Sequence, residues 1–172
     1  MKAPTIMLLA LCLAGCASHK EAAPPTLEEI AVASFRQVLD YPDSFELVSL
    51  VLADSVSCGR NLRLKQSLNE HDLEFDKKYL KSQYQKDVRE KHILDSLETD
   101  FIERDIMDST VAYTYKIIYR TKNLFGAKVL SDSYITLAPD GEVIAVYSDL
   151  NKMPLFPGEF PGYNEIQKIY LE

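Results

Sequence analysis

The chain has 172 residues, a hydrophobic content of 47% and a formal net charge of −7. This acidic balance argues against a nucleic-acid partner and against membrane attachment through surface charge, because both need basic patches. Once a removable N-terminal segment and a spacer are set aside, the remaining length fits one domain with its own hydrophobic core.

The N-terminus has the three zones of a secretory signal. A positive start at Lys2, an uncharged apolar run at Ile6–Ala14 and the small residue Gly15 come before Cys16. An apolar run of this length is too short to span a bilayer as a helix, which needs about 20 residues. The layout therefore predicts that residues 1–15 are a signal peptide that is removed.

The end of this segment, Leu13-Ala14-Gly15-Cys16, resembles the lipobox of bacterial lipoproteins. The resemblance implies cleavage before Cys16, diacylglycerol on its sulfur and an acylated amine, with acyl chains such as palmitate. Two or more acyl chains hold a protein at a bilayer, whereas one gives only marginal binding. Residues 16–25 would then be the lipidated cysteine and a flexible spacer. At the position of Ala17, an Asp would favour the inner membrane, so its absence favours the outer membrane of a Gram-negative bacterium. Which face of that membrane carries the protein stays open.

Residues 26–40 have the pattern of an amphipathic helix. Thr26 and Glu29 fit a capping box at its start, and apolar residues follow at helical spacing. Tyr41-Pro42-Asp43-Ser44 ends the helix, because the residue before a proline disfavours helical backbone. The next segment, Phe45–Val56, is rich in β-branched and apolar residues, which predicts a strand.

Residues 60–106 differ from the rest of the chain. From Asn61 onwards they are dense in Lys, Glu, Asp, Gln and Leu without Gly or Pro, which predicts helix. Two sets of apolar residues recur at near-helical spacing, and the phase slips between them around Arg89 to His92. The segment is therefore expected to be one long bent helix or two helices in a hairpin. The two sets are Leu73, Leu80, Tyr84 and Val88, and then Leu94, Leu97 and Phe101.

Three strands with short turns between them follow. Val111–Arg120 alternates between two faces, Ala127–Leu137 and Glu142–Tyr147 are the next strands, and Pro139-Asp140-Gly141 is a strong turn signal. With the earlier strand these predict an α+β fold, in which the N-terminal helix packs on a roughly four-stranded antiparallel sheet. Residues 26–172 would be a single domain with a helical insertion, and the tail, rich in proline and aromatic residues, is expected to pack across it.

Two turn segments carry a second resemblance. Tyr41-Pro42-Asp43-Ser44 after a helix and Lys122-Asn123-Leu124-Phe125-Gly126 in a later hairpin are similar to small uncharacterised secreted bacterial domains. Those domains have Pro-Asp-Ser and Lys-Asn-x-Phe-Gly at similar places. The chain departs from them by inserting the charged helical segment between the two motifs. They have no established chemistry, so the resemblance assigns no site.

No catalytic set stands out in the sequence. Cys58, the only cysteine left after the signal and the lipobox, is expected to be buried. His71 and His92 lie among acidic residues in the helical segment, but too few ligands converge on them, so neither a metal nor another cofactor is expected. Five aromatic residues are candidates for an interaction surface, although the tyrosines among them share the phase of Val111 and Ile117, which favours a core face. These aromatic residues are Tyr113, Tyr115, Tyr119, Phe156 and Phe160.

The expected function is that of a lipid-anchored cell-envelope protein that binds an envelope protein or polymer and is not an enzyme. Two alternatives stay open. One is an envelope hydrolase or metal-dependent enzyme that uses acidic residues with His71 or His92, for which a histidine beside a carboxylate in a pocket would speak. The other is a carrier of an apolar ligand between sheet and helices, for which a large apolar cavity would speak.

Overall fold

The computed structural model describes residues 23–152 and 159–171. The predicted signal peptide, Cys16 with its lipobox, and Phe156 lie outside these residues. Within them the fold is an α+β mixture with four α-helices and one four-stranded antiparallel sheet, as the sequence predicts. No helix in this part of the chain combines the length and the apolar character needed to cross a bilayer.

Helix α1 (Leu27–Gln37) begins at the predicted capping box. The Glu29 N–H donates to the Thr26 hydroxyl at 3.2 Å, and the Thr26 N–H donates to the Glu29 carboxylate at 2.8 Å. These two bonds satisfy N–H groups that the first turn of a helix leaves without partners. After α1 the chain forms the short 3-10 turn η1 (Pro42–Ser44), where the sequence predicts the helix to be broken.

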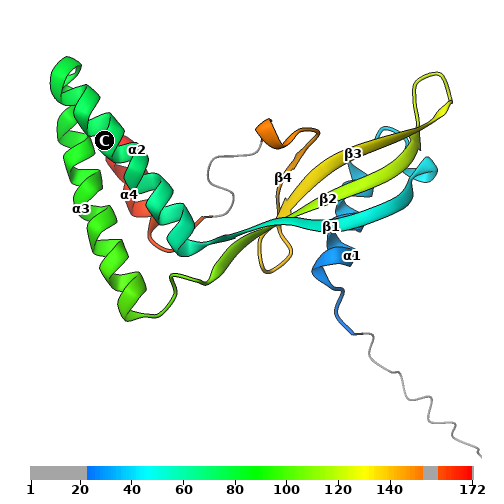
Figure 1. Ribbon diagram of the computed structural model, residues 1–172, viewed down its shortest axis with the longest axis horizontal. Coiled ribbons are helices and arrows are strands. Elements are labelled where there is room, and N and C mark those ends of the chain that lie inside the picture. Colours follow the sequence, from blue (N-terminus) through cyan, green and yellow to red (C-terminus); the bar gives the residue numbers. More distant parts are fainter. Residues whose placement is uncertain (1–22, 153–158, 172) are drawn as a thin grey trace, which may run out of the picture.

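The sheet contains β1 (Glu46–Ser57), β2 (Thr110–Lys122), β3 (Lys128–Leu137) and β4 (Val143–Tyr147), in this spatial order. All neighbouring strands are antiparallel. Helix α1 lies against one face of the sheet, where it contacts β2, β3 and β4 (Figure 1). Between them lies the sheet core, which contains Ala31, Phe35, Tyr115, Ile117, Tyr119, Ile135 and Leu137.

The predicted insertion is a hairpin of two helices, α2 (Cys58–Tyr79) and α3 (Lys81–Glu103), which we call the helical arm. It stands at the end of the sheet opposite the turn between β2 and β3 (Figure 1). The N–H of Cys58 donates to the Ser109 carbonyl at 2.9 Å, and the N–H of Gly59 donates to the Met107 carbonyl at 2.8 Å. The start of α2 is therefore held directly against the segment that returns to β2.

The break between the two arm helices lies at Leu80, so the position that the sequence favoured for it, Arg89–His92, is wrong. Helix α3 is continuous through that region. The misplacement has a physical cause, because Asp87 and Glu90 are buried on the inner side of the arm. Polar residues there interrupt the apolar pattern of a helix that is itself unbroken.

The C-terminal helix α4 (Tyr163–Leu171) packs on α3 and completes a second hydrophobic core at the base of the arm. The described part of the tail therefore packs mainly on the arm. The hydrophobic interior is divided into a sheet core and an arm core, which the sequence pattern does not reveal. The arm core contains Cys58, Leu62, Leu94, Phe101, Phe160 and Ile166.

Candidate functional site

The aromatic residues predicted as an alternative interaction surface lie mainly in the two cores. Tyr115 and Tyr119 are buried against α1, and the half-buried Tyr113 packs beside them. Phe160 is buried in the arm core, with its ring centroid 6.1 Å from that of Phe101. These side chains stabilise the fold and do not present a shared exposed surface, which corrects the interaction-surface interpretation and agrees with the core face favoured for the tyrosines.

The residues considered for chemistry are not assembled into a catalytic site. Cys58 is buried, as predicted, and burial raises the pKa of its thiol, so the reactive thiolate is disfavoured. His71 and His92 are both exposed. His71 lies 3.5 Å from the carboxylate of Asp72, and that carboxylate is also exposed to solvent. In residues 23–152 and 159–171, no group of three or more His, Cys, Asp and Glu side chains is arranged to hold a metal ion.

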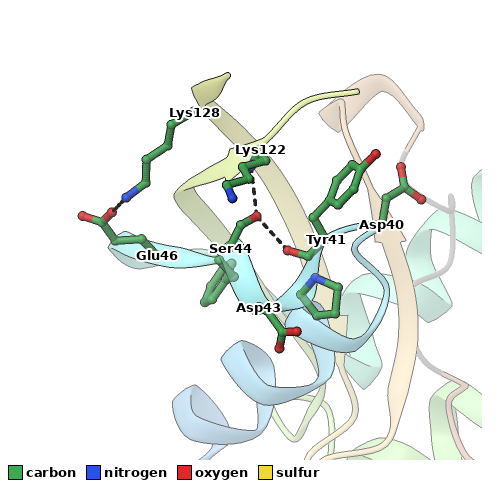
Figure 2. A pocket seen from close by; sticks show the side chains of 9 residues that line it. Asp40, Tyr41, Asp43, Ser44, Glu46, Lys122 and Lys128 are labelled. Carbon is green, nitrogen blue, oxygen red and sulfur yellow. Dashed lines mark hydrogen bonds and ion pairs between the residues drawn. The ribbon is translucent and has the colours of Figure 1, made fainter. Parts of the chain in front are cut away.

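The two motifs of the second resemblance meet in space, at Ser44 (Figure 2). The Ser44 hydroxyl donates to the Tyr41 carbonyl at 2.8 Å, accepts the backbone N–H of Lys122 at 3.0 Å and lies 2.8 Å from the Thr121 hydroxyl. These contacts occupy the hydroxyl, which is therefore a structural link between η1 and β2 and not a free nucleophile. The two turn segments are thus fastened together, which ties η1 to the β2–β3 hairpin.

A hollow of about 630 Å³ lies beside this link, lined by residues 40–46 with Lys122 and Lys128 (Figure 2). Glu46 pairs with Lys128 and, at 3.1 Å, with Arg120. The hydrogen bond and charge of Lys128 lower the pKa of Glu46, and Arg120 lowers it further. The hollow therefore combines charges of both signs and contains no paired nucleophile and base.

The turn between β2 and β3 exposes two adjacent apolar side chains, Leu124 and Phe125, which we call the hairpin tip. They are 81% and 92% exposed, respectively. The turn is held by the Asn123 side chain, which accepts the N–H groups of Phe125 and Ala127, both at 3.0 Å. Gly126 completes the turn with φ of 78°, a left-handed conformation that favours glycine.

The far end of the helical arm exposes a second apolar group, Phe75, Tyr79 and Leu80, which we call the arm tip. These side chains are 50%, 59% and 50% exposed. The Phe75 and Tyr79 rings contact each other one helical turn apart, with centroids 4.8 Å apart. The Lys78 ammonium lies 4.9 Å from the Tyr79 ring centroid, within the range of a cation–π contact.

Polar groups are buried inside the same part of the arm. Asp76 of α2 and Asp87 of α3 are both buried, and the Asn69 amide donates to the Asp87 carbonyl at 3.0 Å. Burial raises the pKa of the Asp87 carboxyl, and the hydrogen bond and charge of Asp76 raise it further. The outer part of the arm therefore has carboxyl groups inside and aromatic rings outside.

The inner polar group continues towards α4 through Glu90. Lys65 forms an ion pair with Glu90 at 2.6 Å, and the Tyr170 hydroxyl donates a hydrogen bond to the same carboxylate. Burial, followed by the Glu90 contact, raises the pKa of Tyr170, which therefore remains a donor at neutral pH. This network joins all three helices of the arm region without forming an accessible catalytic pair.

A further hollow of about 820 Å³ lies between the sheet and the tail segment that leads into α4, with Cys58 at its edge. Its lining includes the apolar residues Val111, Val143 and Phe160, but also the carboxylates of Glu142 and Glu159. An apolar ligand in this hollow would approach those carboxylates and reduce their hydration, at a cost in free energy. The hollow therefore favours the carrier interpretation less than a wholly apolar cavity would.

Comparison with protein-family models, with curated proteins and with solved structures found no match for this chain. Interpretation of its function therefore rests on the geometry of its own residues. The sequence pattern does not single out the arm tip or the hairpin tip, although both leave a signal in it. Phe75 and Tyr79 are aromatic residues four apart in a charged helix, and Leu124 and Phe125 are adjacent apolar residues in a turn.

Proposed function

We propose that the protein is a lipid-anchored cell-envelope protein, without enzymatic activity, that binds a partner protein through the arm tip. One observation carries the proposal: Phe75, Tyr79 and Leu80 are at least half exposed, while Asp76 and Asp87 are buried within the arm. A helix that packs only on its own domain normally has the reverse distribution, with apolar residues inside. Clustered exposed aromatic side chains on a projecting element are typical of a protein contact.

The arm tip has the composition of a contact centre with a polar rim. The Phe75 and Tyr79 rings already contact each other, which limits the conformational freedom that they lose when a partner covers them. Covering the exposed half of each of the three side chains would contribute about 1 kcal/mol per residue. Together that is about 3 kcal/mol, or about a hundredfold in affinity. Exposed Lys77, Lys78 and Lys81 are neighbours of the group in sequence, and Lys78 contacts the Tyr79 ring, which suits a partner with an apolar pocket and an acidic rim.

The anchor is proposed from the lipobox. Acyl chains on Cys16 would hold the acidic folded part at a bilayer, and the outer membrane of a Gram-negative bacterium is the proposed location. Exposed His71 and His92, and a Ser44 hydroxyl occupied by backbone groups, support a binding role over catalysis.

Site-specific photo-cross-linking in intact envelopes tests the arm-tip contact. A photoreactive residue in place of Phe75 is compared with one in place of Ile102, which is 63% exposed on the same arm but lies near its base. We expect a discrete protein product from position 75, which disappears when Tyr79→Ser is added, and no such product from position 102. Equal products from both positions, or products insensitive to Tyr79→Ser, would contradict the contact.

Mass spectrometry of the mature N-terminus tests the anchor separately. We expect a chain that begins at Cys16 and carries acyl chains, and a Cys16→Ala variant that is neither acylated nor retained in the membrane fraction. An unmodified Cys16 on a protein recovered free of membranes would refute the anchor and leave the arm-tip contact to be judged by its own experiment.

A further inference from the structure

The hairpin tip is a preformed apolar projection on a turn in which three backbone N–H groups are already hydrogen-bonded to Asn123. The N–H groups of Phe125 and Ala127 donate to the Asn123 side chain, and the Gly126 N–H donates to the Asn123 carbonyl at 2.8 Å. A segment that enters a medium poor in water must satisfy its backbone groups internally, since each unsatisfied group costs several kcal/mol. The turn that carries Leu124 and Phe125 makes these N–H bonds before any partner is present, which lowers the cost of placing it where water is scarce.

Two lysines flank the tip so closely that their positive charges repel each other unless an anion lies beside them. Lys122 and Lys128 are directly opposite each other in the β2–β3 register, and like charges at opposed positions repel. Glu46 pairs with Lys128, but among the described residues the Lys122 ammonium forms no ion pair with an acidic side chain. A basic pair therefore lies immediately behind an apolar pair, within a chain that is acidic overall.

We propose that the hairpin tip is a second membrane contact, in which Leu124 and Phe125 enter the interfacial region of an anionic bilayer and Lys122 and Lys128 lie beside lipid phosphates. Lysines with apolar stems and charged ends commonly reach this depth beside inserted apolar residues. The exposed side chains project outward on a narrow turn, a form that lipid surrounds without a preformed pocket. This inference goes beyond the arm-tip contact and takes only the nearness of a bilayer from the proposed anchor.

Tryptophan fluorescence tests the insertion, because the chain contains no Trp. Phe125→Trp in the anchored protein is placed in vesicles of phosphatidylethanolamine and phosphatidylglycerol, part of which carries bromine near the top of the acyl chains. We expect emission shifted to the blue and quenched by the brominated lipid. Adding Lys122→Gln should lower the ratio of inserted to free tip about fivefold, since one lysine near an anionic surface contributes about that factor.

Two matched variants separate the outcomes. Leu130→Trp, at a 62% exposed position further along β3, should be neither shifted nor quenched, whereas Phe75→Trp reports on the arm tip. A blue shift at position 125 without bromine quenching would indicate a protein pocket and overturn the proposal, as would quenching at position 75 but not at 125. If the native protein does not float with vesicles, the anchor fails. Coupling Cys16 of the processed chain to a maleimide lipid then restores the tether. The emission shift and bromine quenching of the Trp at position 125 still decide whether the hairpin tip inserts.

Discussion

Replacing Asp87 with Asn tests whether buried carboxyl groups limit the stability of the helical arm. Asp87 is 2% exposed, and its Oδ2 atom has no hydrogen-bond partner among the described residues. Its pKa is raised first by burial and then by the hydrogen bond and charge of Asp76, with a smaller contribution from Asp72, while a hydrogen bond from Gln83 opposes the rise. Asp87 also acts on Tyr170 of α4, whose pKa it helps to raise.

The direction of the pH effect follows from this raised pKa. The folded arm binds the Asp87 proton more tightly than the unfolded chain does, so the resulting stabilisation is complete below the unfolded pKa of about 3.9. It is lost as pH rises through the higher pKa of the folded state. Asn is neutral at every pH and can donate its amide N–H to Asp76, so the variant escapes this loss.

The magnitude follows from the unpartnered oxygen. A buried polar atom without a partner costs about 1–3 kcal/mol, and we expect Asp87→Asn to recover about 1 kcal/mol at neutral pH. For a folded part of this size, that corresponds to a rise in Tm of about 2–4 °C.

Urea unfolding followed by far-ultraviolet circular dichroism, at about pH 4 and about pH 8, measures the effect. The difference in unfolding free energy between Asp87→Asn and the unmodified chain should grow towards the higher pH. Asp108→Asn, at an exposed position in the loop after α3, is the control and should show no such trend. An Asp87→Asn variant that is no more stable at about pH 8, or a difference that does not change with pH, would refute the reasoning.

Three further substitutions test other contacts by the same unfolding measurement. Ser44→Ala removes the link between η1 and β2 and should cost about 1–2 kcal/mol, with faster amide exchange at the end of β2; unchanged exchange would show that the link is dispensable. Gly59→Ala places a Cβ 2.9 Å from the Met107 carbonyl oxygen and should cost about 1–3 kcal/mol, whereas a neutral result would mean that the junction shifts freely. Tyr170→Phe removes the donor to Glu90 and should cost about 1–3 kcal/mol, and an unaltered arm would show that Lys65 alone satisfies the carboxylate.

Local chemistry made much of the fold predictable. The capping box at Thr26 and Glu29 depends on neighbours in sequence, and the alternation from Val111 to Tyr119 marks one face of a strand, so both are confirmed. The Pro139-Asp140-Gly141 turn is likewise specified by residues within it, and it separates β3 from β4 as expected.

Long-range packing set the limits of prediction. The arm turns at Leu80 without Gly or Pro to mark it, and Asp76 and Asp87 are buried although their type indicates a solvent face. Their burial becomes intelligible only when α2, α3 and α4 are seen together. The two apolar tips leave short signals in the sequence, but their exposure depends on what surrounds them in the fold, which local patterns do not specify.

The direct passage of β1 into α2 has a mechanical consequence. The arm is joined to the sheet at two points, because α2 continues the edge strand β1 and α3 leads back into the neighbouring strand β2. Backbone hydrogen bonds at Cys58 and Gly59 hold these two connections together. A sideways force at the far end would be carried as torque into the β1–β2 ladder and would not be absorbed by a loose hinge. A partner bound to the arm would therefore pull on the sheet. The pull would be transmitted through the sheet to its other end, where Lys122 and Lys128 lie.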